Sequence, residues 1–439
     1  MPQEDEYPAG SGLRFFDGML TEILVLVLPA MKKNTLSFGT VCIHNKQQSS
    51  FGHSHMEAIF PTSTFSYDNP EQLMNLFQGT EPGYIYSRWD NPTFHYAADK
   101  ISLLEAFELN NEHGNQLKLK TMLFSSGMGA ISTLLMSCLK PGEKLITQGN
   151  LYGGTDEFIH KILKPLQIDC VMVDLNDTEK LSAILDTSTD IRMMYIETPA
   201  NPTLSCYDLN TLAAIAKKYN LITAADNTFA TPYLQQPFRY GVDYVVHSTT
   251  KFLNGHGNAI GGALVFHEDD DKQTRFHEVM KLLGNNANPF DSWLLSNGLK
   301  TLELRMQKHC ENAMQLAQFF STHPAINKVN YPGLQSHPDH AICNKQMRHA
   351  GAMMSIELFG GLDASKEFIA SLKLATLAVS LGTVDTIVQH PASMSHVKMS
   401  KAQREQYGIL DGLIRISVGI EHIDDLIYDF SYALDKTRA

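Results

Sequence analysis

Short apolar runs alternate with longer amphipathic segments from Lys120 onward. The apolar runs predict strands at 122–124, 144–147, 169–173, 193–196, 221–225, 244–246 and 263–266. The segments between them predict helices near 128–139, 155–164, 178–186 and 208–219. The last of these begins at Asp208, a residue type that caps helix N-termini. Strands and helices that alternate in this way build a mostly parallel sheet covered by helices, so the pattern predicts a large α/β domain.

The pattern changes after Asn288 and Pro289. A long helical stretch over 292–321 precedes short predicted strands near 353–358 and 413–418 and a last helix near 422–436. These elements predict a second, smaller α+β domain. Residues 40–95 carry several prolines among Ser, Thr, Tyr and Asn, which predicts an ordered but irregular arm. Such an arm often packs on a partner subunit.

The first thirty residues do not fit either domain. Their apolar run, Ile23–Leu28, is too short for a membrane span, which needs about 20 residues. The acidic start at Glu4, Asp5 and Glu6 is unlike a secretory signal, which has a basic leader. The segment from Met31 resembles a second chain start, so residues 1–30 are interpreted as a leader outside the folded part.

Composition narrows the classes of function. The chain has 439 residues, of which 43% are hydrophobic and 19% charged, as in ordinary globular proteins. Its net charge of −12 argues against a broad nucleic-acid-binding surface. Six scattered cysteines without a C-x-x-C pair predict reduced thiols in a cytoplasmic protein. The histidine pairs His53/His55 and His337/His340 lack a third nearby ligand, so no metal site is predicted.

One lysine follows a predicted strand and enters a glycine-rich turn. The segment reads Ser248-Thr-Thr250-Lys251 and leads to Gly255. A lysine held among small polar groups can be desolvated, which lowers its pKa and lets the amine form a Schiff base with a carbonyl. The hydroxyls of Ser248 and Thr250 suit a phosphate. A solvated loop lysine is the alternative for this segment taken by itself.

Three other strand ends carry groups that suit the same chemistry. Asp226 ends a predicted strand, and a carboxylate there would suit a protonated pyridine nitrogen, as in pyridoxal phosphate (PLP) enzymes. Gly127 and Met128 lie in a turn that opens a helix and offers free N–H groups to a phosphate. Tyr152, in a glycine turn, could stack on a flat ring. A capping aspartate, a structural turn and a packing tyrosine are the respective alternatives.

Seven segments resemble the signature blocks of the Cys/Met-metabolism (trans-sulfuration) family of PLP-dependent enzymes. They are Tyr86–Thr93, Ser126–Ile131, Tyr152–Thr155, Glu197–Pro202, Asp226–Thr228, Ser248–Lys251 and Leu413–Glu421. The resemblance implies an α/β fold of the PLP-dependent transferase type I, aspartate-aminotransferase-like, with a mostly parallel seven-stranded sheet. It also implies an arm over 31–95, a PLP-binding domain over 96–290 and a C-terminal α+β domain over 291–439.

The resemblance implies a role for each matching residue. Lys251 would bind the cofactor aldehyde and move protons, Asp226 would pair with the pyridinium nitrogen, and Tyr152 would stack on the ring and serve in acid/base steps. Asn201 would lie near the ring hydroxyl. The phosphate would be held by Gly127, Met128, Ser248 and Thr250 from this chain and by Tyr86 and Arg88 from the neighbouring subunit.

Two further residues are implied at the substrate. Arg415, with Ser380, would take the substrate carboxylate, because a guanidinium can bind both oxygens. If Tyr86 and Arg88 serve a neighbour's cofactor, the active unit is at least a dimer, and a dimer of dimers is expected. The expected partners are therefore a small amino acid and further copies of the chain, with no nucleic acid and no membrane.

Two positions that differ between members of the family point to different substrates. Val379 before Ser380 resembles methionine γ-lyases, whereas cystathionine-processing relatives tend to carry a glutamate there. Gly154 resembles the cystathionine enzymes instead. We expect γ-elimination on methionine or homocysteine, releasing a thiol, ammonia and a 2-oxo acid. The alternatives are γ-replacement on an O-acyl-homoserine (cystathionine γ-synthase or O-acetylhomoserine sulfhydrylase), cystathionine γ-lyase and, from another class, a non-catalytic regulator.

Overall fold

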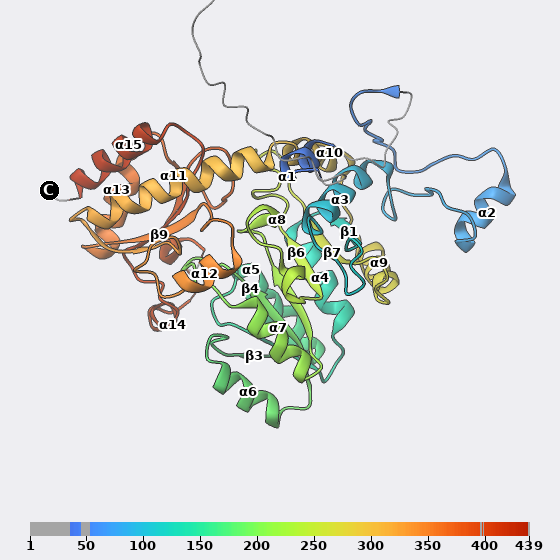
Figure 1. Ribbon diagram of the computed structural model, residues 1–439, viewed down its shortest axis with the longest axis horizontal. Helices are drawn as coiled ribbons and strands as arrows, with labels where there is room; N and C mark the ends of the chain where they lie inside the picture. Colours follow the sequence, from blue (N-terminus) through green and yellow to red (C-terminus); the bar gives the residue numbers. More distant parts are fainter. Residues whose placement is uncertain (1–35, 45–52, 396, 398, 438–439) are drawn as a thin grey trace, which may run out of the picture. The chain divides into compact units, whose positions relative to one another are not determined.

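The computed structural model describes residues 36–44, 53–395, 397 and 399–437. The predicted leader, residues 1–30, lies outside this part of the chain. The described elements form two sheets with their covering helices, shown in Figure 1 from blue at the N-terminal side to red at the C-terminal side.

The larger sheet has seven strands in the order β1-β7-β6-β5-β4-β2-β3. Its strands are β1 Leu119–Phe124, β2 Lys144–Thr147, β3 Asp169–Met172, β4 Ile191–Glu197, β5 Ile222–Asp226, β6 Tyr244–His247 and β7 Gly262–His267. Only β7 runs antiparallel to its neighbours, β1 and β6. The predicted mostly parallel seven-stranded sheet and all seven predicted strands are therefore confirmed.

Helices cover both faces of this sheet, because its strands are apolar on both sides. They are α4 Gly127–Cys138, α5 Gly153–Phe158, α6 Thr178–Thr187, α7 Leu209–Lys218, α8 Thr231–Leu234 and α9 Gln273–Leu283. Leu145 of β2 belongs to the same buried cluster as Leu134 of α4. Ile146, the next residue, belongs to the cluster on the opposite face with Leu212 of α7. Asp208 caps α7 as predicted, since its carboxylate accepts from the backbone N–H of Asn210 at 3.1 Å.

The smaller sheet has five strands in the order β10-β11-β12-β9-β8. They are β8 Ile326–Asn330, β9 Met353–Leu358, β10 Thr376–Leu377, β11 Ile387–Gln389 and β12 Leu413–Ser417. Helices α11 Leu302–Thr322 and α13 Gly361–Ser371 pack on this sheet, and α15 Ile423–Lys436 packs on these two helices (Figure 1). The short helices α12 His340–Gln346 and α14 Lys401–Gln406 complete the region. A smaller C-terminal α+β region is thus confirmed, whereas the exact domain boundaries stay predictions.

The N-terminal arm is less irregular than its composition suggests. It contains α1 Phe38–Ile43 and α2 Pro70–Gln78, and it leads into α3 Pro92–Glu105. The reason is local: Asn69 accepts from the N–H of Glu71 at 2.8 Å, and the proline after it favours the first turn of a helix. In Figure 1, α2 (light blue) projects away from both sheets.

The continuous helix predicted over 292–321 is wrong. The structure has two helices, α10 Pro289–Leu299 and α11, separated at Lys300 and Thr301. The carbonyl of Gly298 accepts from Thr301 N at 3.2 Å in a tight turn and from the Arg305 guanidinium at 2.8 Å. A side chain on the next helix thus binds the carbonyl where α10 ends, and the axis changes direction there.

The guanidinium of Arg305 also joins this helix break to the lysine turn. It is buried and donates to the carbonyls of Phe252 at 2.7 Å and Leu253 at 3.2 Å, the two residues after Lys251. One planar group therefore holds three backbone carbonyls from two segments that are about 50 residues apart in the sequence.

We expect Arg305→Lys to lower the free energy of unfolding by about 2–4 kcal/mol, because one ammonium cannot reach the carbonyls that the guanidinium fork binds. Urea denaturation measures the change. Arg275→Lys is the matched control, since Arg275 is exposed and paired only with Glu278 at 3.6 Å, and it should change the free energy by less than about 0.5 kcal/mol. Equal stability of the two variants would contradict this account.

Candidate active site

Three neighbouring strands end together at one edge of the large sheet. Glu197 at the end of β4 is in register with Asp226 at the end of β5, and Asp226 is in register with Val246 of β6. A cavity of about 270 Å³ lies at this edge, where open α/β sheets bind their ligands. It is lined by Ser126, Gly127, Met128, Ile131, Tyr152, Glu197, Pro199, Asn201, Asp226, Thr228, Phe229, Ser248, Thr250, Lys251, Ile260, Val379, Leu381 and Arg415.

The cavity brings together most of the residues predicted from the sequence. Those that line it are Gly127, Met128, Tyr152, Asn201, Asp226, Ser248, Thr250, Lys251 and Arg415. Ser380 is reached through the lysine, because Lys251 Nζ donates to Ser380 Oγ at 3.2 Å. The roles assigned to these residues stay predictions, but their convergence in one cavity is what those roles require.

Lys251 provides an amine that is partly neutral near physiological pH. Burial is the main cause that lowers its pKa to about 8, and the positive charge of Arg415 is the smaller cause. A neutral amine is the form that attacks an aldehyde. Lys251 is partly buried in the cavity, as that chemistry requires, and its role stays a prediction.

The phosphate end of the cavity is formed by the start of α4 and the β6 turn. Ser126 caps α4, with Oγ accepting from Gly129 N at 3.0 Å. A Cβ on Gly127 would lie 2.8 Å from Ser248 Cβ, so only glycine allows this close approach. The first N–H groups of α4 and the Ser248 hydroxyl thus meet at one point, which suits an anionic group.

Asp226 is partly buried next to groups that hold its carboxylate in place. Oδ1 accepts from Thr228 N at 3.0 Å and Oδ2 accepts from the Tyr195 hydroxyl at 3.3 Å. Burial raises the pKa of the carboxyl, while the hydrogen bonds from Thr228 and the charge of His247 act in the opposite direction. A buried carboxylate of this kind needs a cationic partner, which a protonated pyridine nitrogen would supply.

Glu197 is a site residue that the sequence reasoning did not select. Its Oε2 accepts from Tyr152 N at 2.8 Å and its Oε1 accepts from Asn201 N at 3.1 Å. Burial, with the charge of Asp226 as the second cause, raises its pKa to about 8. Glu197 therefore orients two of the predicted residues, Tyr152 and Asn201, through their backbone N–H groups. It could have been found from the sequence, because it ends its strand as Asp226 does.

Thr228 was also not selected. Its hydroxyl accepts from Ser248 N at 2.8 Å, and its own N–H donates to Asp226. It joins the predicted phosphate end to the predicted ring-nitrogen acid. A threonine two residues after a strand end carries no distinct sequence signal, so its position depends on the fold.

Arg415 presents a guanidinium that the protein satisfies only in part. Nη1 donates to Asn201 Oδ1 at 3.2 Å and Nη2 donates to Ser380 O at 2.8 Å, whereas Nε has no partner in the structure. Burial lowers its pKa to about 10, at which the group remains charged near neutral pH. A buried cation that lines the cavity and keeps one donor unused suits a substrate carboxylate.

Tyr86 and Arg88 do not reach this cavity. Tyr86 is 39% exposed, and the Arg88 guanidinium lies 5.6 Å from its ring centroid. Arg88 Nη1 donates to the carbonyl of Lys281 at 2.6 Å. The two residues are therefore absent from the lining of the chain's own site, as expected for groups that serve a neighbouring subunit.

The comparisons with known proteins agree with this geometry. The Cys/Met metabolism PLP-dependent enzyme family matches residues 39–435. The chain belongs to this family. An L-methionine gamma-lyase of Fusobacterium nucleatum subsp. nucleatum is 42% identical over 407 residues, which cover 92% of this chain and 99% of that protein. A cystathionine beta-lyase of Coxiella burnetii is 40% identical over 380 residues, which cover 86% of this chain and 92% of that protein.

A solved structure gives the same result for the fold. Cystathionine gamma synthase from Xanthomonas oryzae pv. oryzae, in complex with aminoacrylate and cysteine, has a TM-score of 0.84 and 34% identity. The match covers 92% of this chain and 99% of that chain. The predicted family, the type I fold and the dependence on PLP are thus confirmed.

The residues at the site fit PLP in this structure. The glycine-lined helix start suits the phosphate, the buried Asp226 suits the ring nitrogen, and Lys251 suits the aldehyde. Among the described residues, no helix is both long and apolar enough to cross a membrane, and no group of three or more His, Cys, Asp or Glu side chains is arranged to hold a metal ion.

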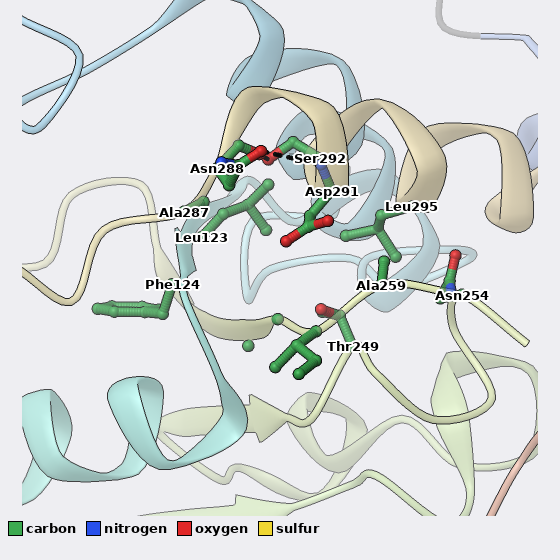
Figure 2. A pocket seen from close by; sticks show the side chains of 13 residues that line it. Leu123, Phe124, Thr249, Asn254, Ala259, Ala287, Asn288, Asp291, Ser292 and Leu295 are labelled. Carbon is green, nitrogen blue, oxygen red and sulfur yellow. Dashed lines mark hydrogen bonds between the residues drawn. The ribbon is translucent and has the colours of Figure 1, made fainter. Parts of the chain in front are cut away.

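Figure 2 shows a second, much smaller cavity between the turn at Thr249 and the first turn of α10. The side chains of Thr249 and Asp291 point toward it. Its volume is about 10 Å³, enough for about one water molecule. This cavity is too small for a cofactor. The 270 Å³ cavity is the candidate active site because the predicted residues converge on it.

Two consecutive glycines at the start of α5 provide a matched test of the site. A Cβ on Gly154 would lie 2.5 Å from Tyr152 Cε1 and 3.1 Å from Met128 Sδ, whereas a Cβ on Gly153 would meet only Ser395 O at 3.8 Å. We expect Gly154→Ala to move the Tyr152 ring and to lower kcat/KM by about 10- to 100-fold.

Steady-state kinetics of the PLP-loaded enzyme measures this effect. Gly153→Ala should stay within about twofold of the parent enzyme, because its Cβ makes an ordinary contact. Tyr152 is 47% exposed and can move outward, so the thermal unfolding midpoint of Gly154→Ala should change by less than about 2 °C. Parent-like kinetics of Gly154→Ala would show that the placement of Tyr152 is not critical.

Proposed function

We propose that this chain is a PLP-dependent carbon–sulfur lyase that carries out γ-elimination on methionine or homocysteine and releases a thiol, ammonia and a 2-oxo acid. The observation that carries the proposal is the apolar outer part of the cavity. Val379 is 74% exposed and Ile260 62% exposed, and both line the cavity together with Phe229 and Leu381.

This outer part offers no anionic partner to a distal amino group. The lining residues, all within the described part of the chain, include two acids, Glu197 and Asp226. Both lie at the strand ends, where Glu197 accepts a hydrogen bond from Tyr152 N and Asp226 accepts one from Thr228 N. A methyl thioether or a short thiol would fit the apolar wall, whereas the second ammonium of cystathionine would lose solvation there without a partner.

PLP, when bound, supplies an electron sink for the bonds that break at the substrate. Within the proposed reaction Arg415 binds the substrate carboxylate, and Ser380, whose carbonyl accepts from Arg415, holds the guanidinium in place. Lys251, with a pKa of about 8, can take the proton from the substrate α-carbon and return it to a leaving group. Tyr152 is placed at the cavity to act in the second proton transfer, at the β-carbon.

The remaining predicted residues hold the cofactor in this proposal. The α4 N-terminus with Gly127 and Met128, and the hydroxyl side chains of Ser248 and Thr250, hold its phosphate. Asp226 pairs with the ring nitrogen. Asn201 lies between Glu197 and Arg415 and is positioned by hydrogen bonds to both, so it can face the ring hydroxyl while it orients the substrate arginine.

A second candidate function is γ-replacement on an O-acyl-homoserine. One observation favours it: Gly154 lies against Tyr152, and the sequence around it resembles cystathionine enzymes. The similar solved structure is itself named a cystathionine gamma synthase, and relatives named cystathionine beta-lyase match as well. The relatives named L-methionine gamma-lyase, at 37–42% identity, support the γ-lyase.

A substrate panel distinguishes these activities. Purified PLP-loaded enzyme should release a 2-oxo acid from methionine or homocysteine with kcat/KM at least about tenfold above that for cystathionine, since an unpaired ammonium costs more than 1.4 kcal/mol. O-acetyl- and O-succinyl-homoserine, each with cysteine or sulfide, complete the panel. Preferred turnover of an activated homoserine ester would overturn the γ-lyase and favour γ-replacement.

We also propose that the active unit is at least a dimer, and a dimer of dimers in full. Tyr86 and Arg88 lie away from their own cavity, and the arm that carries them includes α2, which projects from the sheets in Figure 1. In this arrangement the two side chains reach the phosphate in the neighbour's site. One chain by itself would then hold an incomplete cofactor site.

Mixed dimers test this directly. Lys251→Ala should abolish turnover, and Arg88→Ala should lower it at least about tenfold by weakening cofactor binding. When the two variants are co-expressed with different tags, each mixed dimer contains one site with both intact groups, so activity should return to about half of the parent level. A purified mixed dimer without regained activity would contradict the exchange of Arg88 between subunits.

A reducing compartment such as the cytoplasm completes the proposal. All six cysteines are unpaired, and five of them are buried. Unpaired thiols in this number are typical of proteins that are not exposed to an oxidising environment. The compartment stays a proposal that rests on this thiol usage.

A further inference from the structure

A buried tyrosine lies beside the carboxylate at the end of β5 and has no assigned role so far. Tyr195 belongs to β4, two residues before Glu197, and its side chain is fully buried. Its hydroxyl donates to Asp226 Oδ2 at 3.3 Å. The two residues are 31 positions apart in the sequence, so the pairing of β4 with β5 brings them together.

The register of the two strands explains the contact. Tyr195 is in register with Ala224, which lies two residues before Asp226 on β5. Residues in register on neighbouring strands share a face of the sheet, and so do residues two apart on one strand. Tyr195, Ala224 and Asp226 therefore lie on the same face. Because Ala224 carries only a methyl group, the phenol can extend past it to the carboxylate.

Packing alone does not account for the hydroxyl of this tyrosine. Its ring belongs to a buried apolar cluster that includes Leu134 of α4. Phenylalanine would fill the same space without the cost of burying a hydroxyl. Burial, followed by the charges of Asp226 and Glu197, holds the pKa of the Tyr195 hydroxyl well above its usual value. The phenol thus keeps its proton near neutral pH and donates to the carboxylate.

The hydrogen bond from Tyr195 gives each oxygen of Asp226 a donor. Oδ1 accepts from Thr228 N at 3.0 Å, and Oδ2 accepts from the phenol. Two donors from different elements, one on each oxygen, oppose rotation of the carboxylate about its Cβ–Cγ bond. Hydrogen bonds to a carboxylate also favour its ionised form. Each oxygen can accept a further bond, and Asp226 lines the cavity, so the carboxylate remains open to a ligand there.

We propose that Tyr195 is a positioning residue for the cofactor: its phenol fixes the rotation of the Asp226 carboxylate and stabilises the negative charge that pairs with a protonated ring nitrogen. The inference rests on the proposed pairing of Asp226 with the cofactor and holds whichever sulfur amino acid is the substrate. Without the phenol, Oδ2 loses its donor, and the carboxylate turns or takes up a proton more readily. Its hold on the ring nitrogen then weakens.

The test uses Tyr195→Phe in the full-length enzyme. This variant keeps the ring and leaves no buried donor without an acceptor, so it should fold. The first readout is the ¹⁵N NMR shift of the ring nitrogen in holoenzyme reconstituted with ¹⁵N-labelled PLP. We expect the shift to move toward the value of an unprotonated pyridine. It should move less far than in Asp226→Asn, which removes the negative charge altogether.

The second readout is PLP binding to the apoenzyme. The dissociation constant of Tyr195→Phe should rise about three- to tenfold, the effect of losing one long hydrogen bond to a charged group. Titration of the apoenzyme with PLP, followed by absorbance, measures this constant.

Tyr244→Phe is the matched control. Tyr244 belongs to the same buried cluster, and its hydroxyl donates to Asp270 Oδ2 at 2.7 Å. It is the first residue of β6, at the end of the strand away from the site. The control loses a shorter tyrosine–aspartate bond, so its thermal unfolding midpoint should fall at least as far as that of Tyr195→Phe. Its nitrogen shift and its PLP dissociation constant should stay at the parent values.

A merely structural role of Tyr195 gives a different result. If Tyr195→Phe keeps the parent nitrogen shift and PLP affinity while Asp226→Asn moves the shift, the proposal is overturned. If Asp226→Asn also leaves the shift unchanged, the proposed pairing of Asp226 with the ring nitrogen fails, and this inference fails with it. Failure of the γ-lyase proposal would appear in the substrate panel and would leave the nitrogen shifts unaffected, so the failures can be told apart.

Discussion

The site depends on the in-register parallel pairing of β4, β5 and β6. Because these strands end together, Glu197, Asp226 and His247 arrive at one edge without any contribution from loop geometry. Parallel strands separated by helices place residues from distant parts of the sequence about 5 Å apart at such an edge. Hydrogen bonds then hold residues of the neighbouring loops at this edge. The Glu197 carboxylate holds Tyr152 and Asn201, and Thr228 holds Ser248.

The same edge concentrates charge that protein alone does not neutralise. The carboxyls of Asp226 and Glu197 have raised pKa values, while the cations Lys251 and Arg415 have lowered ones. Each shift has burial as its first cause, so each group would be better solvated outside the cavity. A cofactor with an aldehyde, an anionic phosphate and a basic ring nitrogen offers a partner to several of them at once. Family membership and local physical chemistry therefore lead independently to PLP.

The large and small sheets contribute different halves of the chemistry. The large sheet carries the lysine and the acid for the ring nitrogen, whereas β12 of the small sheet carries Arg415, with Ser380 from a neighbouring segment. Arg305 reinforces this connection, because it ties the carbonyls after Lys251 to the end of α10. The apolar wall at Val379 also comes from the C-terminal region. In the proposed assignment of roles, the region of the first sheet mainly holds the cofactor, and the region of the second supplies the groups for the substrate carboxylate.

The sequence by itself determined the local elements and the residue types at the strand ends. Alternating apolar runs predicted all seven strands of the large sheet, because strand and helix periodicity is a local property. The motifs around Lys251, Asp226 and Gly127 predicted the cofactor for the same reason, since each lies on a short segment. Only the tertiary structure decided the break between α10 and α11, the role of Glu197 beneath Tyr152 and Asn201, and the hydrogen bond from Tyr195 to Asp226. These depend on contacts between residues far apart in the sequence, and no local pattern encodes which distant group will meet a given carbonyl or carboxylate.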